Sequence, residues 1–166
     1  LYHDQALYKE PSGGFTPWHA DQFYWPLASP NTVTVWIPLQ EIPMEMGPLA
    51  FAEQSQGVEI GRDLEISDES EKRLAEELTR QNFTINDTPF ELGEVSYHAG
   101  WTFHRAGPNT SSVPRKVMTM IYMDQDQVIT QPKNSYQQAD WTTWLASFPV
   151  GSKPESELNP LLYKRY

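Results

Sequence analysis

The 166-residue sequence is 39% hydrophobic and 13% aromatic, a composition that predicts a single domain over residues 1–166 with its own apolar core. Its 12 basic and 22 acidic residues give a formal net charge of −10, which argues against nucleic acid and an anionic membrane surface as partners. No apolar run is long enough to span a membrane and no secretory signal pattern opens the chain, so we expect a cytoplasmic protein. The lack of cysteine excludes disulfides, thiolate catalysis and cysteine-bound zinc.

Short extended segments separated by proline and glycine make up most of the chain. The first covers residues 6–8, and residues 32–38 follow with a period of two that is typical of a strand. Residues 94–98 form a third candidate, and residues 115–123 alternate in the same way. This spacing predicts a β-sandwich or barrel. From Gln125 onward the chain is polar with scattered aromatic residues, and we expect an ordered extension that lies over the domain.

Residues 67–81 depart from this pattern and predict the one long helix of the chain. Leu74 and Leu78 stand four residues apart, which places them on one helical face. Asp68 is positioned to cap the helix, with Glu71 three residues later. We expect the acidic side chains from Asp63 to Glu77 to face solvent.

The residues most informative about chemistry are His19, Asp21 and, far downstream, His104. In an extended chain, residues two apart project to the same face, so His19 and Asp21 can occupy adjacent positions on one metal ion. Two histidines and one carboxylate on one side of an ion form the arrangement of non-haem Fe(II) oxygenases. The alternative is a surface histidine beside a turn-capping aspartate, because a His-x-Asp pair is common by chance.

Arg115 begins the alternating segment 115–123, at a position that we expect to face inward. A guanidinium binds a carboxylate through two parallel hydrogen bonds, as an acidic cosubstrate beside a metal would require. The alternative is a surface arginine paired with an acidic side chain. Of the remaining histidines, His98 is either a further metal ligand or, as we favour, a hydrogen-bonded residue behind the ligands, and His3 is expected in solvent.

These residues belong to a longer series of motifs. The series consists of WHADQ at 18–22, WIPL at 36–39, MGPL at 46–49, GEVSYHAGW at 93–101, and then His104 with Arg115. In order and spacing it resembles the phytanoyl-CoA dioxygenase family of Fe(II)/2-oxoglutarate-dependent oxygenases. The resemblance runs from about Tyr8 to Tyr163.

The resemblance implies a mainly β fold, the double-stranded β-helix or jelly roll, with one inserted helix near residues 67–81. It implies that His19, Asp21 and His104 are the ligands of Fe(II) and therefore the catalytic centre. It also implies 2-oxoglutarate and O2 as cosubstrates, with ascorbate as a stimulant. In the family pattern, Arg115 binds the distal carboxylate of 2-oxoglutarate.

Trp36 and Lys9 stand where members of the family line the cosubstrate pocket. The expected reaction is hydroxylation of a small organic substrate, with release of succinate and CO2. Two alternatives stay open: a non-catalytic jelly-roll binding module, and a cupin-type metal enzyme that uses His98 as an additional ligand.

Members of this family carry a largely helical portion ahead of the strand that contains Lys9, and we expect that portion to be missing here. The apolar side chains of Val33, Val35 and Ile37 would pack in part against it. We therefore expect this face to be exposed or to be covered by self-association into a homo-oligomer.

Overall fold

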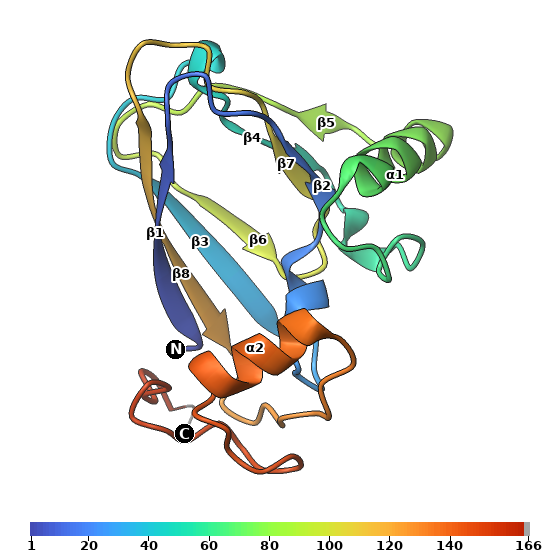
Figure 1. Cartoon of the computed structure of the whole chain (residues 1–166), viewed down its shortest axis with the longest axis vertical. Helices are drawn as coiled ribbons and strands as arrows, with labels where there is room; N and C mark the ends of the chain where they lie inside the picture. Colours follow the sequence, from blue (N-terminus) through green and yellow to red (C-terminus); the bar gives the residue numbers. More distant parts are fainter. Residues whose placement is uncertain (165–166) are drawn as a thin grey trace.

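The computed structural model describes residues 1–164, which form two antiparallel sheets of four strands each (Figure 1). Sheet A has the order β1 (His3–Lys9), β8 (Arg115–Met123), β3 (Thr32–Pro38), β6 (Ser96–Ala99). Sheet B has the order β2 (Thr16–His19), β7 (His104–Ala106), β4 (Leu49–Ala52), β5 (Ile85–Asn86). Two such sheets joined by crossing connections form a jelly roll, which confirms the expected fold class.

Two α-helices flank the sheets in the described part of the chain (Figure 1). Helix α1 (Asp68–Arg80) lies beside β2 on the outer side of sheet B, and α2 (Ser135–Thr143) crosses one end of the sandwich. Three short 3-10 helices complete the fold: η1 (Asp21–Tyr24), η2 (Met44–Met46) and η3 (Ser55–Gly57). Among residues 1–164, no helix is long and apolar enough to cross a bilayer.

Helix α1 begins one residue away from the predicted cap. Ser67, not Asp68, is the N-cap: its hydroxyl accepts a hydrogen bond from the Ser70 backbone N–H at 3.1 Å. The Ser67 N–H in turn donates to the Ser70 hydroxyl at 3.0 Å, so two otherwise unpaired amides are satisfied reciprocally. The predicted helix over 67–81 is thus confirmed with a different capping pair.

A second, shorter helix, α2, lies in the polar tail, where the sequence predicts none. Its sequence carries no regular apolar repeat, which is the signal that a helix prediction requires. The helix is instead fixed by its ends and by packing. The Asn134 side chain caps it by accepting from the Gln137 N–H at 2.8 Å, and the Gln137 side chain donates to the Phe23 carbonyl at 2.8 Å.

Strand β6 starts two residues later than the predicted segment 94–98. Gly93 has a φ of +94°, a conformation that side chains disfavour, and it reverses the chain there. The Glu94 N–H then donates to the Glu91 carbonyl at 3.1 Å to close a turn. Only Ser96–Ala99 pair with β3.

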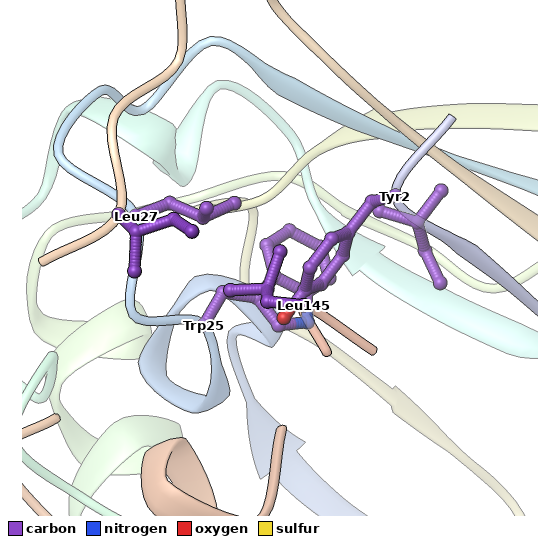
Figure 2. Packing of buried hydrophobic residues seen from close by; sticks show 6 residues of the cluster. Tyr2, Trp25, Leu27 and Leu145 are labelled. Atoms are coloured by element: carbon purple, nitrogen blue, oxygen red, sulfur yellow. The ribbon is translucent and has the colours of Figure 1, made fainter. Parts of the chain in front are cut away.

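A hydrophobic cluster joins α2 and the tail to sheet A. Figure 2 shows Tyr2, Trp25, Leu27 and Leu145 packed together, and all four are buried. The Tyr2 hydroxyl also donates to the Asp140 carboxylate of α2. The tail is therefore an ordered extension packed on the domain, as the sequence predicts.

Strand β3 turns its polar side chains inward. Thr34 and Trp36 are buried on the side of the second sheet, whereas on the opposite face Val33 and Ile37 are partly buried and Val35 is buried. Across β8, Tyr122 lies opposite Val33 and continues the outer face. The apolar face expected for this strand is thus the outer one, but the expectation that it is exposed or needs a second copy to cover it is wrong for Val35, which is buried within this chain. The inner face is left to residues that border a polar site.

Candidate metal centre

Strands β2 and β7 place His19 and His104 directly opposite each other. The two residues are register partners, and their ring centroids are 4.2 Å apart. Because side chains alternate along a strand, the neighbours Trp18 and Arg105 project to the outer side of sheet B. Both imidazoles are left to face the space between the sheets.

Asp21 completes the group from the first residue of η1, immediately after β2. Its Oδ1 lies 3.7 Å from Nε2 of His19 and 3.6 Å from Nε2 of His104. One ligand atom from each of the three residues lies within 4.8 Å of the others, and this is the one such group of His, Asp or Glu among residues 1–164. The structure thus brings together the three residues that the sequence singled out.

The histidine rings are oriented by backbone carbonyls. Nδ1 of His19 donates to the Pro17 carbonyl at 2.7 Å, and Nδ1 of His104 donates to the Thr102 carbonyl at 3.0 Å. A ring that donates through Nδ1 keeps the lone pair of Nε2 free in its neutral form. Hydrogen bonds of this kind fix the orientation of metal-binding histidines.

The electrostatics of the group favour neutral imidazoles and an ionised carboxylate. Burial, reinforced by the nearby His19 and His98, lowers the pKa of His104 to about 3 against the opposing effect of Asp21. Burial also lowers the pKa of His19. Burial acts to raise the pKa of Asp21, but His104, His98 and His19 outweigh it and hold that pKa well below its usual range. The donor set of two neutral nitrogens and one carboxylate fits Fe(II).

Helix α1 supports this pair of strands from outside. Glu71 accepts from the Trp18 N–H at 2.8 Å and from the Arg105 guanidinium at 2.7 Å. These two residues directly adjoin His19 and His104 in sequence. The expectation that the acidic side chains from Asp63 to Glu77 face solvent is therefore wrong for Glu71, which links β2 to β7. No sequence signal distinguishes it from the exposed acids around it.

Arg115 is buried at the start of β8, with 5% of its surface exposed. Its Nη1 donates to the Gly47 carbonyl, and its guanidinium carbon lies 5.5 Å from the ring centroid of Trp36. Nε is buried without a partner. Within residues 1–164 no carboxylate lies within ion-pair distance of this guanidinium, so the reading of Arg115 as a surface residue paired with an acid is wrong.

Lys9 is the register partner of Arg115 across β1 and β8. Its Nζ donates to the Gly107 carbonyl at 2.8 Å and contacts the Thr16 hydroxyl at 3.3 Å. Burial, together with the Arg115 charge, lowers the pKa of Lys9 to about 8, and burial lowers the pKa of Arg115 to about 10. Both groups remain cationic near neutral pH. Two adjacent cations without a carboxylate partner among the described residues form a site suited to an anion.

The other two histidines lie in contrasting places. His98 on β6 lies beside the triad, where its Nε2 is 3.3 Å from Oδ2 of Asp21, and it is not among the three residues whose ligand atoms converge. His3 is buried and stacks on Trp144 with ring centroids 4.5 Å apart. The expectation that His3 is solvated is wrong. Strand β1 pairs with β8 along its whole length, and Trp144, which directly follows α2, covers the His3 ring.

A cleft of about 720 Å³ borders the triad. Phe51 and His98 belong to its wall, and their rings lie 6.1 Å and 4.6 Å from the His104 ring. The polar side chains along the cleft include Glu53, Gln54, Gln56, Asn86 and Glu94. Glu53 and Glu94 thus give the cleft an acidic character. Lys9 and Arg115 are not among the residues that line it.

Comparisons with known proteins agree with this geometry. The family model described as Phytanoyl-CoA dioxygenase (PhyH) matches residues 1–117, a range that includes the triad, Lys9 and Arg115. A protein of Stutzerimonas stutzeri, named as a probable alpha-ketoglutarate-dependent hypophosphite dioxygenase, is 26% identical over 133 residues. That match covers 76% of this chain and 46% of the relative, so the chain spans about half the length of this relative.

Two solved structures from nogalamycin biosynthesis are similar in fold. The non-heme alpha ketoglutarate dependent epimerase SnoN superposes over 100% of this chain and 63% of its own, with a TM-score of 0.76 and 21% identity. The carbocyclase SnoK covers 93% of this chain and 58% of its own, with a TM-score of 0.73 and 25% identity. A further SnoN structure contains Fe3+, alpha ketoglutarate and nogalamycin RO, with a TM-score of 0.68 and 23% identity over 99% of this chain and 62% of that one. The match of the family model to most of this sequence, together with these likenesses, shows that the chain belongs to the phytanoyl-CoA dioxygenase (PhyH) family.

Proposed function

We propose that this protein is an Fe(II)- and 2-oxoglutarate-dependent oxygenase that hydroxylates a small organic substrate. The observation that carries the proposal is the convergence of His19, Asp21 and His104 in a fold that also buries Arg115. In this assignment the three convergent residues hold Fe(II), and Arg115 with Lys9 binds the distal carboxylate of 2-oxoglutarate. The oxidation is supplied by Fe(II) with 2-oxoglutarate and O2, which together give succinate, CO2 and one oxygen atom for the substrate.

The side chains of this chain have the properties that these roles require. His19 and His104 are neutral and aim Nε2 at the carboxylate of Asp21, so the donor atoms are arranged before an ion arrives. Arg115 and Lys9 bring two positive charges to the interior, where a dicarboxylate is attracted strongly because water competes little. The Trp36 ring packs beside the guanidinium and limits its orientations.

The cleft beside the triad is the proposed entry for the substrate. Its carboxylates, amides and aromatic rings suit an uncharged or cationic organic molecule. Hydroxylation is proposed over the reactions in the names of SnoN and SnoK because it needs nothing beyond C–H oxidation at the centre described.

Succinate formation tests the proposal against the non-catalytic alternative. The protein is supplied with Fe(II), ascorbate and 2-oxoglutarate in air, and succinate is measured by mass spectrometry. We expect succinate from the unmodified chain, produced slowly without substrate, and none above background from Asp21→Ala. If the unmodified chain binds a divalent metal and 2-oxoglutarate but yields no succinate, the binding-module alternative is correct.

A further inference from the structure

The two carboxylate oxygens of Asp21 have different surroundings. Oδ1 faces Nε2 of both His19 and His104. Oδ2 accepts a hydrogen bond from the Thr34 hydroxyl at 2.8 Å and lies 3.3 Å from Nε2 of His98. Only 22% of the Asp21 side chain is exposed, so water has little access to either oxygen.

Both groups that face Oδ2 come from the opposite sheet. Thr34 on β3 and His98 on β6 are register partners, and both are buried. Sheet B therefore carries the two histidines of the triad, and sheet A holds the second oxygen of its carboxylate.

The hydrogen bond to Asp21 is the one that His98 makes through its ring. A carboxylate only accepts, so Nε2 of His98 carries the hydrogen and donates it to Oδ2. Nδ1 is buried and has no partner. A buried polar atom without a partner costs free energy, and a phenylalanine would fill the same space without that cost. The hydrogen bond to Asp21 therefore explains why a histidine, and not a phenylalanine, occupies this position.

The position of His98 also does not suit a metal ligand. Its Nε2 is directed at Oδ2, the oxygen that faces away from His19 and His104. The rings of Phe51 and His104 lie 5.2 Å and 4.6 Å from its own and confine it there. The cupin-type alternative therefore lacks its additional ligand in this arrangement.

We propose that His98, assisted by Thr34, is a positioning residue that holds Asp21 as a one-oxygen ligand. By occupying Oδ2, the two side chains leave Oδ1 alone to face the ion and prevent the carboxylate from binding through both oxygens. An ion held through Oδ1 alone would have room for a further ligand, such as the cosubstrate. This inference rests on the proposed function.

Cobalt(II) binding to the metal-free protein tests this role without any need for turnover. We compare the unmodified chain with His98→Gln, whose amide N–H can reach Oδ2, and with His98→Phe, which fills the space but cannot donate. Thr34→Val removes the second donor at nearly constant volume. His3→Phe is the matched control, because His3 is also a buried sheet A histidine with an unpartnered Nδ1.

We expect His98→Phe to weaken cobalt affinity by about tenfold or more, in line with the loss of a group that orients a metal ligand. Its visible cobalt spectrum is expected to change, because Asp21 gains a second free oxygen. His98→Gln is expected to keep both the spectrum and, within about threefold, the affinity. The cobalt affinity of Thr34→Val is expected to lie between those of His98→Phe and His98→Gln. His3→Phe is expected to alter thermal stability but not cobalt affinity.

The results that overturn the inference differ from those that overturn the proposed function. If His98→Phe and Thr34→Val bind cobalt like the unmodified chain, the positioning role is wrong while the metal centre stands. If His98→Gln loses cobalt as completely as His104→Ala, His98 is a ligand and not a positioning residue. If the unmodified chain binds no cobalt, the metal centre itself is wrong, and the proposed function fails with it.

Discussion

Arg115 and Lys9 are two adjacent cations whose surroundings indicate a binding site for an anion. A buried guanidinium with an unpartnered Nε, beside a half-buried ammonium, is costly because neither cation has a carboxylate partner among the described residues. Their only oxygen partners in the described chain are neutral: the Gly47 and Gly107 carbonyls and the Thr16 hydroxyl. A dicarboxylate would supply the missing negative charge.

The geometry at Arg115 predicts a specific effect of Arg115→Lys. Lysine keeps the charge but loses the planar fork and the packing against Trp36, so 2-oxoglutarate affinity should fall about tenfold or more. Anaerobic calorimetry of 2-oxoglutarate binding in the presence of Mn(II) measures it. Arg73→Lys, on the exposed face of α1, is the control and should bind normally. An affinity within about twofold of the unmodified chain in Arg115→Lys would refute the assignment.

At this scale the sequence predicted the convergence of His19, Asp21 and His104 and the burial of Arg115, for a physical reason. Their roles toward a metal and 2-oxoglutarate stay predictions. His19, Asp21 and Arg115 owe their orientation to strand alternation or to a spacing of two residues, which a sequence displays directly. The hydrogen bond from Thr34 to Asp21 and the bonds of Glu71 arise between elements far apart in the chain. No local pattern in the sequence encodes such contacts.

Helix α1 is the element that holds the two histidine strands together. Glu71 links the Trp18 N–H to Arg105, so Glu71→Ala removes two charge-assisted hydrogen bonds and leaves the backbone amide unpaired. We expect a loss of about 1.5–3 kcal/mol in the free energy of unfolding. Cobalt affinity is expected to fall as well, because the register of His19 against His104 loosens. Urea unfolding and cobalt titration provide the measurements.

Glu69→Ala serves as the comparison for that prediction. Glu69 is on the same helix, but its side chain is 70% exposed and pairs only with Arg73 at 3.4 Å. Its replacement should change stability by about 0.5 kcal/mol or less. Equal effects of the two variants would mean that Glu71 acts only as an ordinary helix residue.

Asp140 of helix α2 is expected to make a pH-dependent contribution to the free energy of unfolding. Burial raises the pKa of Asp140 to about 6, although the hydrogen bond from the Tyr2 hydroxyl acts in the opposite direction. A carboxyl whose pKa is raised on folding stabilises the protein at acid pH, and this contribution is lost as the pH rises toward about 6. Asp140→Asn should therefore melt near the unmodified chain at about pH 4 and several degrees above it at about pH 7.

Thermal unfolding of both proteins at the two pH values checks this prediction. The difference between the two melting temperatures isolates Asp140 from the histidines of the triad. Those histidines have lowered pKa values and act in the opposite sense, because they destabilise the fold as the pH falls below about 6.5. A difference that does not grow with pH would contradict the raised pKa.

The sequence predicted those helices and strands whose local hydrophobic pattern agrees with their packing in the fold. The strands at 32–38 and 115–123 and the helix at 67–81 have strong periodicity, and the structure matches them. Helix α2 was not predicted because its stability comes from the Asn134 cap and from the Gln137 contact with Phe23. The start of β6 was misplaced because a turn at Gly93 takes two residues that alternate like a strand.

At the scale of the whole molecule, the candidate metal centre spans the two sheets. Sheet B supplies His19 and His104, and sheet A holds Asp21 through Thr34 and His98. An ion bound by the triad would therefore join the sheets and stabilise the folded state as a unit. Unfolding separates the three ligands, so the unfolded chain has no comparable site.

This arrangement predicts a large rise in melting temperature with metal. Mn(II) at about 100 times its dissociation constant should add about 2.7 kcal/mol to the free energy of unfolding, which is roughly 5–10 °C for a chain of this size. Differential scanning calorimetry measures the rise, with His104→Ala as the control. An equal rise in both proteins would show that the metal binds elsewhere, for example to the surplus of surface carboxylates.

The most direct test of the account is a crystal structure of the protein grown without oxygen with Mn(II) and 2-oxoglutarate. The account predicts an anomalous scattering peak bonded to Nε2 of His19, Nε2 of His104 and Oδ1 of Asp21, at roughly 2.0–2.2 Å. It also predicts that the distal carboxylate of 2-oxoglutarate lies on the Arg115 guanidinium, with Oδ2 of Asp21 still bonded to Thr34 and His98. A metal peak away from these three residues, or a 2-oxoglutarate carboxylate bound away from Arg115, would contradict it.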